Sequence, residues 1–358
     1  MTAGGLLDGL PEALRAVRPR EAAARLAGVV RRTPLARFPA PTPGLELRLK
    51  LECLQETGAF KARGAWNQVA LLPADARARG VVTASSGNHA GALAWAAARA
   101  GVPCVVCMPA DAYPNKVEAC RRHGAEVLLS PTRAEAEAAC AERAAAGAVL
   151  VPPYDHARTI EGASTVGLEL LEDAAGGPGA EPGPEPSAGW PIDVVVVPVG
   201  GGGLLAGVAL ALHAAFAHAP PEGPGRRPRI VGVEPAGAPK MTRALAAGAP
   251  VTLARIETTV QGLCPPRVGH LTLAAARALV DRVVTLDDAA ILRAQARLVR
   301  EGGWTVEPAG AAAAALVLEG GLAAALPDLR PTGRPLHVVA IVSGGNPDPA
   351  QLAQLRAD

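Results

Sequence analysis

DVVVVPVGGGGLLAGVALALHAAF, residues Asp193–Phe216, joins three features whose order sets the expected fold. The first part, Asp193–Val197, is short and consists of four consecutive valines after the aspartate, which is typical of a strand buried on both faces. Four glycines follow at 200–203, and Leu204–Phe216 then has the composition of a helix. Such a glycine loop lets the backbone wrap closely around a phosphate group. It has neither the Gly-Lys-Ser/Thr of a Walker loop nor the GxGxxG spacing of a dinucleotide site.

The same alternation of apolar runs and helical stretches continues from about residue 46 to the end of the chain. Further strands are predicted at Leu45–Leu51, Val81–Ala84, Cys104–Met108, Glu126–Leu129, Val149–Pro152, Ile230–Val233, Arg282–Leu286 and His337–Val342. Helical periods lie between most of them, at Ala90–Ala100, Arg133–Ala146, Ala289–Arg300 and Ala311–Leu318. Continuously apolar strands separated by helices indicate parallel sheets flanked by helices, so the predicted fold class is α/β.

The composition argues against several classes of function. The chain has 358 residues, a formal net charge of +2 and 49% hydrophobic residues, with acidic and basic residues interspersed. No block of Lys and Arg indicates a nucleic acid or a membrane surface as a partner. The sequence contains no secretory signal and no apolar stretch of membrane-spanning length, so we expect a soluble, cytoplasmic protein.

Two further segments are interpreted as structural. Cys104 and Cys107 form a CxxC, but they lie in the apolar run Val102–Met108 and no second CxxC is present. Buried thiols are therefore predicted in place of a zinc site. Ala174–Gly189, AAGGPGAEPGPEPSAG, is too rich in Gly and Pro for a helix or a strand and is predicted to be a mobile surface loop.

A candidate reactive lysine lies in the segment Thr57–Ala65, TGAFKARGA. Thr57 is predicted to cap a helix that runs to about Leu72, which places Lys61 in the first turn. There the positive end of the helix dipole disfavours the protonated amine, and apolar surroundings lower its pKa further. A lysine with a lowered pKa suits Schiff-base chemistry. The alternative is an ordinary solvated surface lysine.

Two polar loops follow predicted strands. Ser85–His89, SSGNH, comes directly after the strand Val81–Ala84 and before a helical stretch. Its backbone N–H groups and the helix dipole can therefore bind a carboxylate or a phosphate. The alternative is an ordinary N-terminal cap of that helix. Ser343–Asn346, SGGN, comes after the last predicted strand.

Taken together, these segments resemble the fold-type II pyridoxal-phosphate (PLP) enzymes, and within them the branch of threonine and serine dehydratases and serine racemase. The resemblance runs from the Arg-Thr-Pro-Leu at residues 32–35 to the last strand. It implies a two-domain fold of the tryptophan synthase β type, with a small domain of residues 53–157 inserted into a large PLP-binding domain of residues 1–52 and 158–358. It also implies PLP as the cofactor, a small-molecule amino acid as the substrate, and a homodimer or higher homo-oligomer.

The resemblance also implies roles for single residues. Lys61 would hold PLP as a Schiff base and later act as the catalytic base at Cα, and Ser86 would be the acid or base on the opposite face. The other cofactor contacts would come from Phe60, Asn88, Gly200, Gly201, Gly202, Gly203, Leu204 and Ser343. The substrate carboxylate would bind to Ser85, Ser86, Gly87, Asn88 and His89. A neutral Ser343 hydroxyl at the pyridine nitrogen makes the ring a weaker electron sink than a carboxylate would, which favours prompt loss of a β-substituent.

The function implied is a dehydratase, or ammonia-lyase, that converts a small β-hydroxy-amino acid such as threonine or serine to a 2-oxo acid and ammonia. An amino-acid racemase is the first alternative, because Ser86 matches the second acid/base of serine racemase. A β-replacement synthase fits less well, since that branch typically has Thr-Ser-Gly-Asn-Thr in place of Ser85–His89. A non-catalytic PLP-binding homologue is a further alternative, because the chain departs from the family pattern at Gly91, Ala163, Ser164 and Gln261.

One departure concerns a metal site. Relatives with a divalent metal use a glutamate, a backbone carbonyl four residues on and an aspartate six residues on, which here are Glu234, Ala238 and Lys240. Lysine is no ligand for a hard cation such as Mg²⁺ or Ca²⁺. No metal is therefore expected, and we hypothesise that the Lys240 ammonium takes the place of the cation and pairs with Glu234. The alternative is a Lys240 side chain that points to solvent.

Overall fold

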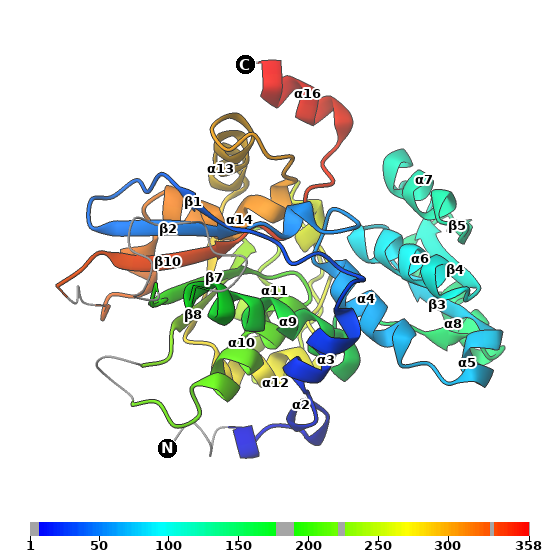
Figure 1. The fold of residues 1–358 in the computed structure, drawn as a ribbon. Helices are drawn as coiled ribbons and strands as arrows, with labels where there is room; N and C mark the ends of the chain where they lie inside the picture. The colour runs from blue at the N-terminus through cyan, green and yellow to red at the C-terminus, as the bar shows by residue number, and fades with distance from the viewer. Residues whose placement is uncertain (1–6, 177–189, 221–225, 330–332, 358) are drawn as a thin grey trace.

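The computed structural model describes residues 7–176, 190–220, 226–329 and 333–357, which form two sheets with helices around them (Figure 1). The six-stranded sheet has the order β1-β2-β10-β7-β8-β9, and the four-stranded sheet has the order β5-β4-β3-β6. The strands are β1 Leu35–Phe38, β2 Leu45–Lys50, β3 Val81–Ala84, β4 Cys104–Pro109, β5 Glu126–Ser130, β6 Val149–Leu150, β7 Val194–Pro198, β8 Arg229–Pro235, β9 Arg282–Leu286 and β10 Leu336–Ile341.

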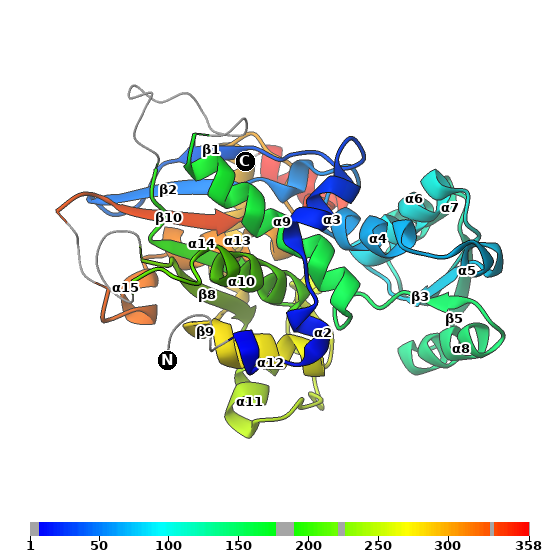
Figure 2. The ribbon, with the colours of Figure 1, turned by 60° about the horizontal axis from the view of Figure 1, so that its bottom comes forward.

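Helices cover the faces of both sheets (Figure 1, Figure 2). They are α2 Glu12–Arg15, α3 Pro19–Leu26, α4 Lys61–Ala70, α5 Ala74–Arg79, α6 Asn88–Ala100, α7 Pro114–Arg122, α8 Arg133–Ala145, α9 Ala157–Ala174, α10 Gly203–Ala215, α11 Lys240–Ala247, α12 His270–Leu279, α13 Asp288–Arg300, α14 Pro308–Leu318, α15 Leu322–Ala325 and α16 Pro349–Ala357, with short 3-10 turns η1 Glu52–Leu54 and η2 Gln261–Leu263. Within the described ranges, none of these helices has the length and apolarity needed to span a bilayer.

The α/β class is confirmed, and the strands predicted from apolar runs pair in parallel with one another. β1 was not predicted, and it pairs antiparallel with β2, with Leu35 opposite Lys50. Its four residues, LARF, include the exposed Arg37, so they lack the continuous apolar pattern of the other strands. Of the predicted loop Ala174–Gly189, the first residue ends α9, and residues 177–189 lie outside the described part of the chain.

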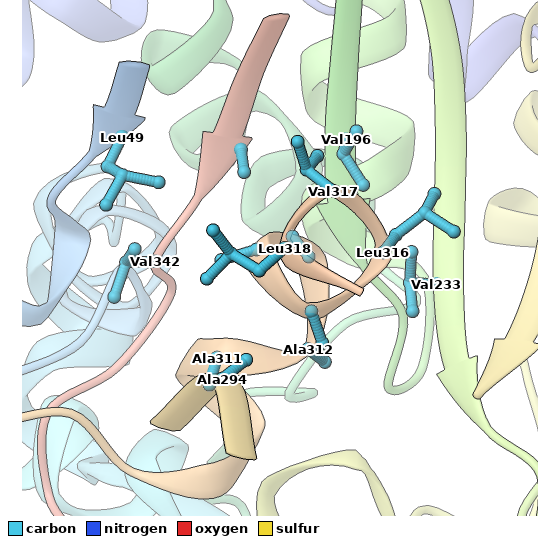
Figure 3. Close-up of a cluster of buried hydrophobic side chains, with 14 of the residues drawn as sticks. Leu49, Val196, Val233, Ala294, Ala311, Ala312, Leu316, Val317, Leu318 and Val342 are labelled. Atoms are coloured by element: carbon cyan, nitrogen blue, oxygen red, sulfur yellow. The ribbon is translucent and has the colours of Figure 1, made fainter. Parts of the chain in front are cut away.

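The six-stranded sheet is called the large sheet below, and the four-stranded sheet the small sheet. The centre of the large sheet is buried on both faces, as the sequence of β7 predicted. Val194 and Val196 belong to one hydrophobic cluster, whereas Val195 and Val197 belong to another on the opposite face. The first cluster includes most of α14, which is apolar all round and buried along its length. Figure 3 shows α14 within this cluster, together with the side chains of β7 and β8. Cys104 and Cys107 are also buried, as predicted, and burial raises the pKa of the Cys104 thiol to about 12.

The strand order determines where the predicted loops meet. β7 ends at Pro198 and the glycines at 200–203 follow, while β10 ends at Ile341 and Ser343 follows. Since β7 and β10 are parallel neighbours, both loops leave the same edge of the large sheet. This carboxyl edge is where open α/β sheets bind ligands. α4 lies between the two sheets, in contact with α6 and with α9 (Figure 1, Figure 2).

Candidate active site

The helix that carries Lys61 begins later than the sequence indicated. α4 starts at Lys61 itself, Phe60 takes the N-cap position, and no side chain caps the helix. The predicted Thr57 cap is wrong, since the Thr57 hydroxyl is buried without a hydrogen-bond partner among the described residues. The reason is that the residues before the helix pair with another segment, through a bridge between Ala59 and Gly344.

The Lys61 amine faces a backbone carbonyl and an aromatic ring. Nζ donates a 2.6 Å hydrogen bond to Pro153 O and lies 4.9 Å from the centroid of the Phe60 ring. Although the side chain keeps partial exposure, burial lowers the pKa of its amine to about 8. The neutral amine is the nucleophile in Schiff-base formation, so the lowered pKa makes more of the reactive form available near neutral pH.

The segment Ser343–Asn346 lies directly against the residues before α4. Phe60 N donates to Ser343 O at 3.1 Å, and Gly345 N donates to Gly58 O at 2.7 Å. The Ser343 side chain is buried, and its hydroxyl donates to Ala309 O at 3.4 Å. Two of the predicted segments, far apart in the sequence, therefore lie side by side.

Asn88 connects these segments to a carboxylate that the sequence analysis missed. Asn346 Nδ2 donates to Asn88 Oδ1 at 3.0 Å, and Asn88 Nδ2 donates to Glu307 Oε1 at 2.5 Å. Lys116 Nζ also donates to Asn88 Oδ1, at 3.0 Å, and lies 3.5 Å from Glu307 Oε2. Glu307 is buried, and a Cβ on Gly344 would lie only 2.2 Å from its Oε1. The glycine is therefore required for this close approach.

The loop Ser85–Gly87 leads directly into α6, which begins at Asn88. Gly87 takes the N-cap position and no side chain caps the helix, so the interpretation as an ordinary serine cap is wrong. The partly exposed Ser86 hydroxyl has no hydrogen-bond partner within the described ranges. The N-terminus of α6 and the hydroxyls before it are thus available to an anion such as a carboxylate.

His89 is buried one residue into α6. Its Nε2 lies 3.0 Å from Val151 O, and its Nδ1 is buried with no partner among the residues that the structure describes. Burial, together with the positive charge of Lys61, lowers the pKa of His89 to about 3. The ring is therefore neutral at physiological pH and adds no positive charge to the site.

The glycine loop after β7 is packed against an aromatic ring that the sequence analysis did not identify. A Cβ on Gly201 would lie 2.2 Å from the Tyr154 ring, and one on Gly203 would lie 3.1 Å from Tyr154 Cβ. Gly202 has a φ of +92°, which favours glycine. In the described part of the chain, the N–H groups of Gly200, Gly201 and Gly202 meet no acceptor. Such donors at the N-terminus of α10 are what a phosphate group requires, so the loop fits one.

The segment Pro153–Asp155 connects the lysine to the glycine loop. Pro153 accepts the hydrogen bond from Lys61, and Tyr154 covers the loop. The Asp155 carboxylate accepts hydrogen bonds from the first N–H groups of α12, at 2.9 Å from His270, 2.9 Å from Leu271 and 3.2 Å from Thr272. The segment is therefore anchored on α12, and its position sets the distance between the lysine and the loop.

A buried charge network supports α4 behind the site. Arg63 lies two residues after Lys61, and its guanidinium is 2.7 Å from Glu52 and 2.6 Å from Glu169. Lys50 Nζ lies 2.7 Å from Glu169 and contacts a further carboxylate on α9. Burial opposes ionisation of Glu169, but Arg63 and Lys50 outweigh it and lower its pKa. The network ties β2, α4 and α9 together.

Lys240 is fully buried, so the interpretation as a solvent-directed side chain is wrong. Its Nζ lies 3.5 Å from Glu234 Oε2 and donates to three carbonyl oxygens: Val199 at 3.2 Å, Ala238 at 2.9 Å and Leu263 at 2.9 Å. Burial lowers the pKa of Lys240, and Glu234 opposes that shift. One carboxylate and three carbonyl oxygens around a single positive charge form the kind of oxygen shell that hard cations take.

All four predicted segments meet at this edge of the large sheet. Phe60, next to Lys61, contacts Ser343 directly, and the Asn88 side chain reaches Asn346 of the same segment. The glycine loop joins them through Pro153 and Tyr154, and Leu204 is buried in the first turn of α10. A partly buried lysine, a neutral hydroxyl and a loop of backbone N–H donors are therefore held in one place.

Comparison with known proteins gives consistent findings. The sequence profile described as "Pyridoxal-phosphate dependent enzyme" matches residues 26–344. The chain is 38% identical to a serine racemase of Oryza sativa subsp. indica over 92% of its own length and 90% of the relative's. It is 39% identical to a biosynthetic L-threonine dehydratase of Mycobacterium leprae, over 91% of its own length and 71% of the relative's. The structure of maize serine racemase superimposes with a TM-score of 0.79, 36% identity and 94% coverage of both chains.

Proposed function

The chain belongs to the family of pyridoxal-phosphate dependent enzymes, and from this we propose that it is a dehydratase (ammonia-lyase) of a small β-hydroxy-amino acid such as threonine or serine. The observation that carries the proposal is a single site that holds the Lys61 amine, with a pKa of about 8, and the neutral Ser343 hydroxyl. PLP, when bound, supplies an electron sink conjugated to the substrate Cα. A neutral group at the pyridine nitrogen limits that sink, which favours prompt loss of a β-substituent.

Each part of the cofactor has a matching group in the site. The N–H donors of Gly200, Gly201 and Gly202, with Gly203 and the first turn of α10 at Leu204, would hold the phosphate. Phe60 would pack against the ring, the Asn88 amide would donate to the 3-oxygen, and Ser343 would face the pyridine nitrogen. These assignments are part of the proposal, and they use only groups that the fold brings together.

The remaining groups would act on the substrate. The loop Ser85–Gly87 and the N-terminus of α6 would bind the substrate carboxylate, which orients the Cα–H bond toward Lys61. The neutral Lys61 amine would then take the proton from Cα, and the hydroxyl would leave Cβ as water once it has taken up one proton, so that the proton held by Lys61 balances the proton that leaves in the water. The enamine product takes up one water and releases ammonia, so each substrate molecule gives one 2-oxo acid and one ammonia.

Racemisation is the second candidate, and Ser86 is the residue that supports it. A racemase needs a second acid/base on the face opposite Lys61, and that group must exchange its proton rapidly. The Ser86 hydroxyl makes no hydrogen bond to any described side chain that would take its proton. This favours elimination over racemisation, although the chain is similar to proteins of both kinds.

Product analysis distinguishes the two. The purified protein with PLP is given L-serine, D-serine and L-threonine separately, and 2-oxo acid, ammonia and the opposite enantiomer are measured over time. Equal amounts of 2-oxo acid and ammonia, well above any inverted amino acid, support the dehydratase. Inverted amino acid as the main product would assign a racemase, and a coloured protein with no product would assign a non-catalytic homologue.

Three further proposals follow from the family. They are a small domain of residues 53–157, a cytoplasmic location, and a homodimeric or higher assembly. Sedimentation of the holoenzyme at several concentrations tests the assembly.

Cofactor attachment should depend on pH through Lys61. Only the neutral amine attacks the aldehyde of PLP, so the neutral fraction rises as pH rises through the pKa of about 8. The rate at which apoprotein becomes coloured is therefore expected to rise about fivefold from pH 7 to pH 8, to about double again above that, and to level off above about pH 9. Stopped-flow absorbance measures this rate. A rate that keeps rising to about pH 10, as for an unperturbed lysine, would contradict the lowered pKa.

Divalent metals should have no effect on activity. Because the Lys240 ammonium lies among Glu234 and three carbonyl oxygens, the position of a cation is already filled by a side chain. Exhaustive chelation, and then addition of Mg²⁺ or Ca²⁺, is expected to leave the turnover rate within about twofold of its starting value. Strong activation of the chelated enzyme by either metal would show that a metal binds elsewhere or displaces Lys240.

A further inference from the structure

The Asn88 side chain is held by charged partners on both ends of its amide. Oδ1 accepts from Lys116 Nζ at 3.0 Å and from Asn346 Nδ2 at 3.0 Å, while Nδ2 donates to Glu307 Oε1 at 2.5 Å. An ammonium has only donors, and an ionised carboxylate has only acceptors. The reversed amide would therefore place N–H against N–H at Lys116 and oxygen against oxygen at Glu307. The two charges fix which end of the amide faces which way.

Lys116 comes from a different part of the fold than two of its partners. It lies in the first turn of α7, beside the four-stranded sheet, whereas Glu307 and Asn346 lie at the edge of the six-stranded sheet. Its Nζ also donates to Asn346 O at 2.8 Å, so it holds the loop after β10 as well as Asn88. The Lys116 side chain is 15% exposed and the Glu307 side chain is 8% exposed, so water screens the attraction between their charges only weakly.

From this arrangement we propose that Lys116 is a positioning residue, which turns the Asn88 amide so that its N–H group serves as the hydrogen-bond donor to the cofactor. The inference rests on the proposed function, in which Asn88 contacts the 3-oxygen of PLP. A donor at that oxygen stabilises its ionised form, and the nearby Lys116 charge offsets that of Glu307. Without Lys116, the amide can turn its oxygen toward the cofactor, and the Glu307 charge is left with less compensation. Both changes favour the protonated 3-oxygen.

Absorbance reports this change separately from activity. The yellow, visible band of enzyme-bound PLP belongs to the form with an ionised 3-oxygen, and the near-ultraviolet band belongs to the form in which it is protonated. We expect Lys116→Met and Lys116→Gln to lower the ratio of visible to near-ultraviolet absorbance about tenfold at one fixed pH, the effect of one lost charged neighbour. Lys116→Arg keeps a donor-only cation and is expected to keep the wild-type ratio. Turnover should fall in parallel with the visible band.

A neighbouring residue provides the matched control. Asn115 Nδ2 donates to Pro347 O at 3.4 Å, so Asn115→Ala removes a contact between the same two parts of the fold without touching Asn88. This variant is expected to keep the wild-type spectrum, and circular dichroism checks that all four variants fold. The proposal is overturned if Lys116→Gln has the wild-type spectrum, or if Asn115→Ala changes it as much. A wild-type protein that never becomes coloured with PLP would instead overturn the proposed function.

Discussion

Replacing Lys61 with alanine is expected to abolish 2-oxo acid release and to leave the protein without covalently bound cofactor. The amine at this position is the one that we propose both attaches PLP and removes the Cα proton, so its loss removes two steps at once. Turnover is expected to fall by about 10⁴-fold or more, in line with the loss of a catalytic nucleophile or base elsewhere. The measurement is 2-oxo acid release at saturating PLP, with the visible spectrum of the dialysed protein.

The control for this variant is Arg143→Met, because the one ion pair of Arg143 within the described residues is to the exposed Glu126 on the edge strand β5, at 3.1 Å. It should keep both colour and turnover. Borohydride reduction then locates the attachment site, since it makes the bond to the lysine permanent. A label found on a residue other than Lys61, or colour that persists in Lys61→Ala after dialysis, would show that another amine holds the cofactor.

Replacing Arg63 with methionine is expected to lower the free energy of unfolding by about 3–5 kcal/mol, the usual effect of removing one partner of a buried ion pair. Arg63 is 0% exposed and holds two carboxylates, Glu52 and Glu169. Methionine replaces the volume of the side chain but none of its hydrogen bonds, so Glu52 is left buried without its main cation. Unfolding in urea, followed by far-ultraviolet circular dichroism, measures the loss.

The surface variant Arg143→Met is again the comparison, and it should cost only about 0–1 kcal/mol. Equal stabilities of the two variants would mean that the buried network contributes no more than a surface pair. The pH dependence gives a second check. The folded-state pKa of Glu169 is lowered from its ordinary value of 4.5, so its contribution is present above that pH and is lost as the pH falls below it. Wild type should therefore lose more stability than Arg63→Met on acidification below about pH 4.5.

The parts of the fold that the sequence predicted are those set by local pattern. β7, the glycines and α10 follow one another within 24 residues, and each has a composition that only a few local structures tolerate. The same holds for Ser85–His89 and for the loop after β10, since each is a short polar loop that directly follows an apolar strand. For these elements local sequence is sufficient evidence.

The features that were missed depend on partners distant in the chain. Thr57 looks like a helix cap, but pairing with residues 343–346 moves the start of the helix to Lys61. Glu307 appears in the sequence as a single acid before an apolar helix, and nothing local shows that its carboxylate turns toward Asn88. Tyr154 was overlooked for the same reason, since its contact with Gly201 is visible only in three dimensions.

The distribution of the lysines has a practical consequence for chemical labelling. The sequence has 35 Lys and Arg residues, but its lysines are only Lys50, Lys61, Lys116 and Lys240. None of them is exposed, and the first and last are fully buried in ion pairs. Arginine therefore carries the positive charge of the described surface. Amine-directed reagents such as succinimidyl esters should leave the side chains of the folded protein nearly unmodified, and free PLP should find few side-chain amines for non-specific attachment. After incubation with PLP and borohydride reduction, a single modified peptide is therefore expected, with little background from other lysines.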